Sequence, residues 1–310
     1  MAEINYNEKT IMKNGFPQIK KLGAISANGE MTPFVWNGKL MRLELVDPTN
    51  GLDKGQAKYA VIRDCETGEY ISKFAEDSYY HSAYIEGDTA YVLGVSLLTW
   101  DTILVYESKD LVNWTSRVLL QKPGFFFCNT ALTKGPEGYV LLLEAGEPKE
   151  LVGDYPYTFF FATSPDLITW TFMDYDTAVF KDRYCGAPWL KYSEGYYYMI
   201  SLAELPCLRY SNYLYRTKDF RNWEVGLYNP LLMPSEEDRQ ISPNAHGDLT
   251  DALKEEIKTG FLSNNSDIDM CDYNGKTYLN YLAGNQLGYY YMLEAEYDGT
   301  VAEFLKANFE

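Results

Sequence analysis

The chain lacks long apolar runs, and its N-terminal segment 1–16 lacks the apolar core of a signal peptide. No stretch reaches the roughly 18 apolar residues that a membrane-spanning helix requires. We therefore expect no membrane partner and a cytoplasmic location, although a secreted protein trimmed of its signal would look the same. Hydrophobic residues still make up 46% of the chain, which is enough for a large core and excludes a disordered protein.

Cysteine is scarce and irregularly spaced. The five cysteines, at positions 65, 128, 185, 207 and 271, are odd in number and include no Cys-x-x-Cys pair. Their spacing predicts neither a zinc site nor a disulfide framework. We interpret them as reduced, mostly buried thiols, and no cofactor follows from them.

Positive charge is also in short supply, with 27 Lys and Arg against 44 Asp and Glu and a formal net charge of −17. A nucleic-acid-binding protein needs a basic footprint, and anionic membrane surfaces attract basic segments. Both kinds of partner are therefore excluded. A neutral ligand fits this charge most easily, while cationic groups or a metal ion are also compatible with it.

A repeated unit runs along the chain. Three segments share a β-rich run, a Ser or Thr, a turn with Asp, and a Trp four residues after that Asp: YESKDLVNWTSRVLL (106–120), FATSPDLITWTFMDY (161–175) and YRTKDFRNWEVGLYN (215–229). Five hairpin segments accompany them, each with an apolar strand, a glycine-containing turn and an aromatic strand. Their turn glycines, at 38, 87, 138, 195 and 275, lie 49, 51, 57 and 80 residues apart. A period of about 50 residues with four strands per unit is typical of a β-propeller.

The sequence therefore predicts an all-β fold, a single five-bladed β-propeller domain over residues 1–310. The last glycine interval is about 30 residues too long, which places a short helical insertion at 229–262, between blades four and five. Asp248 or Thr250 would cap the helix, Leu253 and Ile257 would share a face, and Gly260 would end it. The blades are expected at 28–76, 78–122, 126–180, 184–228 and 264–308.

A functional site is expected at one end of the central channel. The first strand of each blade lines the channel, so residues just before strand one and just after strand two converge on one funnel. These positions are Glu30, His81 with Ser82, Asn129, Cys185 with Gly186, and Asp267 with Asp269 at strand one, and Glu44, Trp100 with Asp101, Glu144 with Glu147, Glu204, and Asn285 with Gln286 at strand two. Glu144 and Glu204 end apolar runs. Burial of a carboxyl group requires a partner and often raises its pKa, which is how general acids are made.

Asp267 and Asp269 flank a single residue, and alternate residues of a strand point to the same side. Two acids on one face suit glycoside hydrolysis, which uses a pair of carboxyl groups. The same two acids could instead hold a structural Ca²⁺ ion or form hydrogen bonds with the backbone of a turn. The three interpretations stay open at this stage.

At these positions the chain resembles the five-bladed propeller glycoside hydrolases, which include arabinanases, β-xylosidases, α-L-arabinofuranosidases and invertases. The resemblance covers about residues 28 to 305 and rests on SKDLVNW, SPDLITW and TKDFRNWE, on the hairpin SEGYYYMISLAE, and on NNSDIDMCDYNGKTYLNYLAGNQLG. It implies a carbohydrate substrate and an acid just before strand one of blades one, three and four. Glu30 occupies that place in blade one, but blades three and four offer Asn129 and Gly186. Asp267 adds an acid in blade five.

We therefore predict a glycoside hydrolase that acts on an oligosaccharide by carboxylate acid–base chemistry in the funnel. Glu30 and Asp267 would be the base or nucleophile and its partner, and Glu204 the general acid. The residues expected to bind substrate are His81, Trp100, Asn129, Glu144, Asp269, Arg209 and Gln286.

Three alternatives remain. The missing acids of blades three and four also fit a carbohydrate-binding propeller without chemistry. Cys185 and His81 could form a thiolate nucleophile with its base. Arg183 and Arg209 could bind phosphate in a phosphorolytic variant of the reaction.

The insertion at 229–260 could supply a subunit contact.

Overall fold

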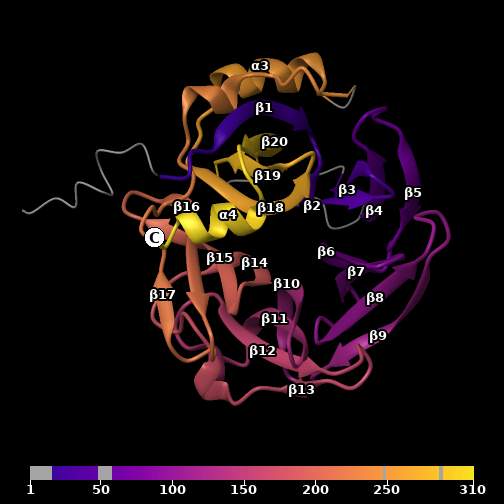
Figure 1. Ribbon diagram of the computed structural model, residues 1–310, viewed down its shortest axis with the longest axis vertical. Helices are drawn as coiled ribbons and strands as arrows, with labels where there is room; N and C mark the ends of the chain where they lie inside the picture. The colour runs from indigo at the N-terminus through magenta and orange to yellow at the C-terminus, as the bar shows by residue number, and fades with distance from the viewer. Residues whose placement is uncertain (1–15, 48–57, 247–248, 286–288) are drawn as a thin grey trace, which may run out of the picture.

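The computed structural model describes residues 16–47, 58–246, 249–285 and 289–310, and strands dominate these segments. Figure 1 shows the sheets arranged as blades around a common centre. The predicted fold, an all-β propeller of five blades with a helical insertion between blades four and five, is confirmed.

Blades one to four each pair four consecutive strands antiparallel in chain order, and a parallel bridge between Tyr210 and Asn264 joins blade four to blade five in one sheet. Their strands are β2 (Gly29–Trp36), β3 (Lys39–Val46), β4 (Tyr59–Asp64) and β5 (Tyr70–Phe74) in blade one; β6 (Ser78–Glu86), β7 (Thr89–Ser96), β8 (Thr102–Ser108) and β9 (Thr115–Gln121) in blade two; β10 (Phe126–Gly135), β11 (Gly138–Glu147), β12 (Thr158–Ser164) and β13 (Thr171–Phe172) in blade three; and β14 (Gly186–Ser193), β15 (Tyr196–Leu205), β16 (Arg209–Thr217) and β17 (Trp223–Val225) in blade four. Two short helical segments, α2 (Lys149–Val152) and η1 (Tyr175–Thr177), belong to the connections around β12 and β13.

Blade five is built from both ends of the described chain. Its inner strands are β18 (Asn264–Tyr273), β19 (Lys276–Gly284) and β20 (Tyr290–Tyr297), and its outer strand is β1 (Lys20–Ser26), which pairs antiparallel with β20. The structure therefore differs from the expected bounds of this blade, 264–308. Pairing between segments so far apart in sequence leaves no local pattern, which is why the closure of the ring was not predicted.

The end of the chain forms a helix instead of a strand. In α4 (Val301–Ala307), Thr300 and Glu303 form a reciprocal capping box, and Val301, Phe304 and Leu305 are buried at the spacing of one helix face. Figure 1 shows α4 lying across the strands of blade five. In the described part of the chain, no helix is long and apolar enough to cross a membrane.

The Ser-x-Asp-x-x-x-Trp turns fold alike in blades two, three and four. The Asp110 carboxylate accepts the backbone N–H groups two and three residues ahead, at 2.9 and 2.8 Å, and Asp166 and Asp219 do the same. The Trp114 ring then stacks on Phe74 of the preceding blade, with 4.0 Å between ring centroids. The motif thus makes a turn and, in blade two, a contact with the neighbouring blade.

The insertion contains the predicted helix, α3 (Asp251–Thr259). The Thr250 hydroxyl accepts the N–H of Leu253, and Gly260 follows the last turn. Ile257 is fully buried while Leu253 packs at the edge of the same cluster. Thr250 is therefore the cap of this helix. Asp248, the other candidate, lies outside the described residues.

A buried carboxylate anchors the insertion to blade five. Asp238, in η2 (Glu236–Arg239), has no exposed surface and forms an ion pair of 2.8 Å with Lys21 of β1. It also accepts hydrogen bonds from the Tyr281 hydroxyl and from the Asn265 amide. The insertion therefore binds both the closing strand and the interior of the blade (Figure 1).

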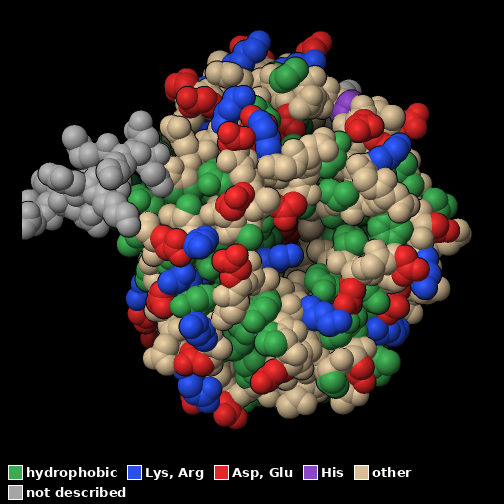
Figure 2. All heavy atoms as spheres, in the orientation of Figure 1, with side chains coloured by type: hydrophobic (Ala, Val, Ile, Leu, Met, Phe, Trp, Pro, Cys, Tyr) green, Lys and Arg blue, Asp and Glu red, His purple; other side chains and the backbone are tan. Residues whose placement is uncertain are grey.

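The first strand of each blade lines a central channel. At the hairpin end of these strands the channel widens into a cavity of about 190 Å³. Figure 2 shows this hollow at the centre of the ring. The starts of the same strands lie at the other end, where the sequence predicts the site.

Ring closure should contribute measurably to stability. Ile25 of β1 is only 1% exposed, and its truncation to Ala should lower the free energy of unfolding by about 2–5 kcal/mol, because a buried side chain leaves a cavity. Urea denaturation followed by fluorescence measures the change. Ile168→Ala is the matched control, since Ile168 is 71% exposed and its truncation should have little effect. Equal losses for the two variants would show that β1 does not hold the ring closed.

Candidate active site

A β-bulge interrupts the first strand of every blade at the same place. In each bulge, two residues of the first strand oppose one residue of the second strand. The bulged pairs are Glu30–Met31, Tyr80–His81, Cys128–Asn129, Ala187–Pro188 and Asp267–Ile268, and the opposing residues are Glu44, Gly94, Glu144, Ser201 and Tyr281. The five blades therefore present equivalent positions at the start of the channel.

The first residue of four of these bulges has a left-handed backbone. The φ angles are 43° at Glu30, 56° at Tyr80, 46° at Ala187 and 52° at Asp267. A non-glycine residue in this region costs of order 1–3 kcal/mol, and such residues concentrate at functional sites. Although the bulge interrupts the strand between Asp267 and Asp269, both residues line the same cavity.

Glu30 and Asp267 line one small cavity of about 40 Å³ at the start of the channel. Both side chains are half-buried, so they remain accessible. Burial raises the pKa of Glu30 well above its usual range, and the nearby Asp267 and Glu144 carboxylates add to the effect. Burial raises the pKa of Asp267 as well. The charge on Asp267 disfavours ionisation of Glu30, so the two carboxyl groups resist ionising together.

Glu144 is the third acid of the cluster. Its carboxyl group is buried, and burial raises its pKa to about 8. The Asn129 amide and the Ala187 backbone N–H both donate to Oε2, at 3.1 and 3.0 Å, which opposes the shift. Among the described residues Oε1 has no hydrogen-bond partner. The proton of the neutral acid therefore belongs on Oε1.

Glu44 occupies the position in blade one that Glu144 occupies in blade three, but its surroundings are opposite. Arg42 and Arg63 approach its Oε1 at 2.7 Å, and the Asn28 amide donates to Oε2 at 2.6 Å. These partners outweigh burial and hold the pKa of Glu44 below its usual range. Glu44 is therefore an ionised structural group, while Glu144 is a neutral acid at pH 7.

Aromatic rings surround the acids. Five half-buried tyrosines, Tyr79, Tyr80, Tyr157, Tyr184 and Tyr290, each have a pKa raised by burial and further by at least one of the three carboxylates. The Tyr80 ring meets Trp100, which stacks on Phe126 with 5.2 Å between ring centroids. Such a wall suits a ligand with apolar ring faces and hydroxyl groups.

Several residues that the sequence predicted lie at or next to this cluster. His81 and Asp269 line the same cavity as Glu30, and Asn129 holds Glu144. Burial lowers the pKa of His81 to about 4 and raises that of Asp269 to about 7, so His81 is neutral at pH 7. His81 Nε2 lies 2.8 Å from the Ser78 hydroxyl. Gly94 opposite it has no room for a side chain, because a Cβ there would come within 2.7 Å of the His81 ring.

Other predicted residues lie elsewhere. Glu204 is exposed near the end of β15, opposite Tyr210, and does not line the cavity of Glu30 and Asp267. Arg209 donates from Nη1 to the Leu262 carbonyl at 2.6 Å. Gln286 lies outside the described residues.

The thiol and phosphate alternatives gain no support. Cys185 is fully buried, its Sγ donates to the Tyr157 carbonyl, and burial raises its pKa well above the usual range. His81 contacts Ser78 instead, so the expected Cys185–His81 pair is not formed. Arg183 is exposed and paired with Asp182 at 2.7 Å.

The bulges correct two expected equivalences. The residues that match Glu30 are Cys128 in blade three and Ala187 in blade four, and not Asn129 and Gly186. Counting from the turn glycines fails in blade three because its bulge lies further from the turn: Glu30 lies eight residues before its glycine, and Cys128 lies ten. In blade four Ala187 lies eight residues before Gly195, as Glu30 does before Gly38, so the expected Gly186 is one residue too early.

The five tyrosines around the acids were not predicted, because no motif marks them. The available signal was the position of Tyr79, Tyr80 and Tyr184 immediately before the predicted strand-one residues.

Among the described residues no group of three or more His, Cys, Asp or Glu side chains is arranged to hold a metal ion. Asp267 and Asp269 both face the small cavity, but burial raises the pKa of each, which favours the protonated form over a metal ligand.

Solved structures with the same fold are propeller glycoside hydrolases. A glycoside hydrolase matches with a TM-score of 0.59 and 12% identity over 95% of this chain and 96% of its own. The native Bacillus subtilis arabinanase matches with a TM-score of 0.53 and 12% identity over 89% and 96%. A mutant Bombyx mori β-fructofuranosidase in complex with sucrose matches with a TM-score of 0.55 and 14% identity over 93% of this chain and 63% of its own.

No protein-family model and no curated protein matches the sequence. The similarity therefore lies in the fold, which this chain shares with five-bladed propeller glycoside hydrolases of known structure.

The raised pKa of Glu144 should make stability depend on pH. A folded-state pKa near 8, above the unfolded value, means that its contribution is complete below the unfolded pKa and disappears as pH rises through about 8. We expect the free energy of unfolding to fall between pH 5 and pH 8.5 by up to about 1.4 kcal/mol per pH unit for this group. Glu144→Gln should flatten that slope in urea denaturation at several pH values.

Glu44→Gln is the matched control for this experiment. Its folded pKa is lowered, so its contribution has the opposite sign and is lost as pH falls. The substitution leaves two arginines without their carboxylate and should cost about 3–5 kcal/mol at pH 7. It should leave the fall in stability between pH 5 and 8.5 in place. If the dependence of stability on pH became flatter in the Glu44 variant and not in the Glu144 variant, Glu44 and not Glu144 would be the group with the raised pKa.

Proposed function

We propose that this protein is a glycoside hydrolase that cleaves a glycosidic bond of a neutral oligosaccharide in the central funnel. The observation that carries the proposal is the cluster of Glu30 and Asp267, at equivalent bulge positions, with Glu144, which opposes the bulge of blade three; all three have raised pKa values, and aromatic rings surround them. A pair of carboxyl groups, one protonated and one ionised, is the chemical requirement of this reaction. The fold it shares with known propeller glycoside hydrolases agrees with this assignment.

Glu144 is the general acid of the proposed mechanism. It is neutral at pH 7, as a proton donor must be, because its pKa is about 8. Asn129 and the Ala187 N–H fix Oε2, which leaves the proton on Oε1 for the leaving-group oxygen. This role replaces the one expected for Glu204, which is exposed and outside the cluster.

Glu30 and Asp267 supply the second carboxyl function. They line one cavity and resist ionising together, so one member can act in the ionised form while the other keeps its proton. The ionised carboxylate activates water or attacks the anomeric carbon. The protonated carboxyl group donates a hydrogen bond to the ionised one. Burial and the Asp267 charge raise the pKa of Glu30 well above its usual range, and Lys58, which is paired with Asp47 at 2.9 Å, opposes them only in part. Asp267 is therefore the member that we assign as base or nucleophile, with Glu30 as its protonated partner.

The substrate of the proposed enzyme is uncharged. Four carboxyl groups lie in the funnel, those of Glu30, Asp267, Asp269 and Glu144, and Arg209 and Arg183 form their contacts elsewhere. A sugar with its own carboxylate would meet repulsion at these acids, while a neutral sugar can stack on the tyrosines and share hydrogen bonds with the carboxyl groups.

A second candidate is a propeller that binds carbohydrate without cleaving it. Cys128 and Ala187 favour this alternative, because they stand where the resemblance implies acids in blades three and four. Both functions use the same funnel, and turnover separates them. Binding of an oligosaccharide by purified protein without release of reducing sugar would support the second candidate.

Hydrolysis of 4-nitrophenyl glycosides and of disaccharides of pentoses and hexoses tests the roles. Glu144→Gln should lower kcat/KM on disaccharides by about 10²- to 10⁴-fold, the usual contribution of a general acid. The loss should be smaller on 4-nitrophenyl glycosides, because that leaving group departs without a proton. Glu204→Gln is the matched control and should be as active as the wild type. Equal rates for the wild type and the Glu144 variant would remove Glu144 from the mechanism.

The pH profile of the same reaction gives an independent test. The wild-type rate should fall as pH rises through about 8, where Glu144 loses its proton. Glu144→Gln should lose this alkaline limb, while Asp267→Asn should be nearly inactive at every pH. An alkaline limb that persists in the Glu144 variant would assign the acid to another group.

A further inference from the structure

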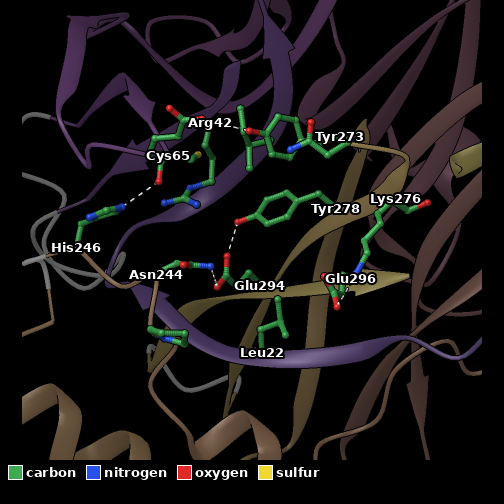
Figure 3. Close-up of a pocket in the computed structure, with 15 residues that line it drawn as sticks. Leu22, Arg42, Cys65, Asn244, His246, Tyr273, Lys276, Tyr278, Glu294 and Glu296 are labelled. Atoms are coloured by element: carbon green, nitrogen blue, oxygen red, sulfur yellow. Dashed lines mark hydrogen bonds and ion pairs between the residues drawn. The ribbon is translucent and has the colours of Figure 1, made fainter. Parts of the chain in front are cut away.

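A second cavity lies at the seam between blades one and five, and it is larger than the two cavities at the ends of the channel. Its volume is about 670 Å³, within the range of small-molecule sites. β3 and the turn after β4 form one wall, β19 and β20 form the other, and the insertion segment 243–246 contributes the edge. Figure 3 shows these elements around the cavity, with Leu22 of β1 on its floor.

Arg42 offers an unused donor to this cavity. The side chain is only 3% exposed, its Nε donates to Glu44 Oε1 at 2.9 Å, and its Nη2 forms an ion pair with the same oxygen at 2.7 Å. Nη1 has no hydrogen-bond partner among the described residues. Figure 3 shows Arg42 among the residues that line the cavity. A ligand oxygen in the cavity can accept a hydrogen bond from this donor.

Glu294 fixes the opposite wall. It is 1% exposed, and the Tyr278 hydroxyl donates to its Oε2 at 2.6 Å, while the Asn244 amide donates to its Oε1 at 2.9 Å. Ser242 also donates to Oε1. The network holds the cavity wall in a defined shape before any ligand arrives, which lowers the entropic cost of binding.

Charged side chains of both signs line the cavity: Arg42 and Lys276, and Glu66, Glu294 and Glu296. Arg42 is paired with Glu44 at 2.7 Å behind the wall, and at the rim Lys276 pairs with Glu296 at 3.2 Å. An anionic ligand would meet the carboxylates and a cationic one the guanidinium. A ligand whose hydroxyl groups both donate and accept satisfies each wall without net charge.

Two aromatic side chains also line the cavity. Tyr273 and Tyr278 line the cavity and are half-buried, and Figure 3 shows both on the side of blade five. Their rings offer an apolar surface for the C–H face of a sugar ring.

We infer that this cavity is a second, non-catalytic binding site for a neutral saccharide unit. The site is separate from the funnel, since it shares no lining residue with the cavity of Glu30 and Asp267. A bound sugar contacts β1, blade one, blade five and the insertion at once. Occupancy of the site therefore stabilises the seam at which the ring closes.

Leu22 provides a way to block the site. Leu22→Trp should fill the floor of the cavity, while Leu22→Ala leaves it open and is the matched control. We would titrate the wild type and both variants with D-galactose, L-arabinose, D-xylose and D-glucose, and with D-galacturonate as the charged comparison. Calorimetry and ligand-observed NMR up to about 50 mM sugar would detect sites with millimolar Kd.

At least one neutral sugar should bind the wild type, and Leu22→Trp should weaken that binding by about tenfold or more, equivalent to about 1.4 kcal/mol. Leu22→Ala should change it far less. Glu30→Gln, which lies in the funnel, should bind that sugar with unchanged affinity at this site. These results separate the site from the proposed hydrolase, because they hold whether or not the funnel is active.

A second pair of variants guards against misfolding of the Leu22→Trp protein. Tyr273→Ala should weaken the same binding about fivefold to tenfold, in line with the loss of one aromatic contact. Tyr155→Ala, at a 40% exposed tyrosine outside the cavity, should not. The inference is overturned if no neutral sugar binds, if binding ignores Leu22→Trp and Tyr273→Ala, or if only galacturonate binds.

Discussion

The pairing of β1 with β20 is the interaction on which the rest of the structure depends. It joins the first described strand of the chain to the last blade, and it sets blade one against blade five. Glu30 and Asp267 belong to those two blades and share one cavity. Their raised pKa values depend on burial and on each other, so the electrostatics of the site follows from backbone hydrogen bonds made at the perimeter of the ring.

The equivalent residues of the blades show how one position acquires different roles. Glu44 and Glu144 both oppose a bulge, but Glu44 meets two guanidinium groups and Glu144 meets only neutral N–H donors. The first is ionised and the second keeps its proton. The difference comes from the presence of Arg42 and Arg63 on the strands of blade one, and not from the carboxyl group or its place in the fold.

Much of the fold was predictable because its signals are local. Turn glycines, hairpin spacing and the Ser-x-Asp-x-x-x-Trp turns each act within one blade, and they give the number of blades and the place of the insertion. The cap at Thr250 and the buried Ile257 also follow from short patterns. The outer strand of blade five was not predictable, since its partner lies at the other end of the chain.

The site was predictable in part. Glu30, Asp267, Asn129 and Glu144 were all selected from their positions at strand ends, and the structure groups them. The exposed position of Glu204 could not be read from the sequence, because Glu144 and Glu204 both end apolar runs. Telling them apart requires the surroundings of each carboxyl group, which are supplied by other blades.

The short link between β1 and β2 has a consequence for how the site forms. Only Ala27 and Asn28 separate the outer strand of blade five from the first strand of blade one, and Asn28 itself donates to Glu44. Any displacement of β1 is therefore transmitted within a few residues to Glu30. Glu30 belongs to blade one and Asp267 to blade five, so the two carboxyl groups come together only when these blades are joined. Opening of the ring would separate them and take the site apart.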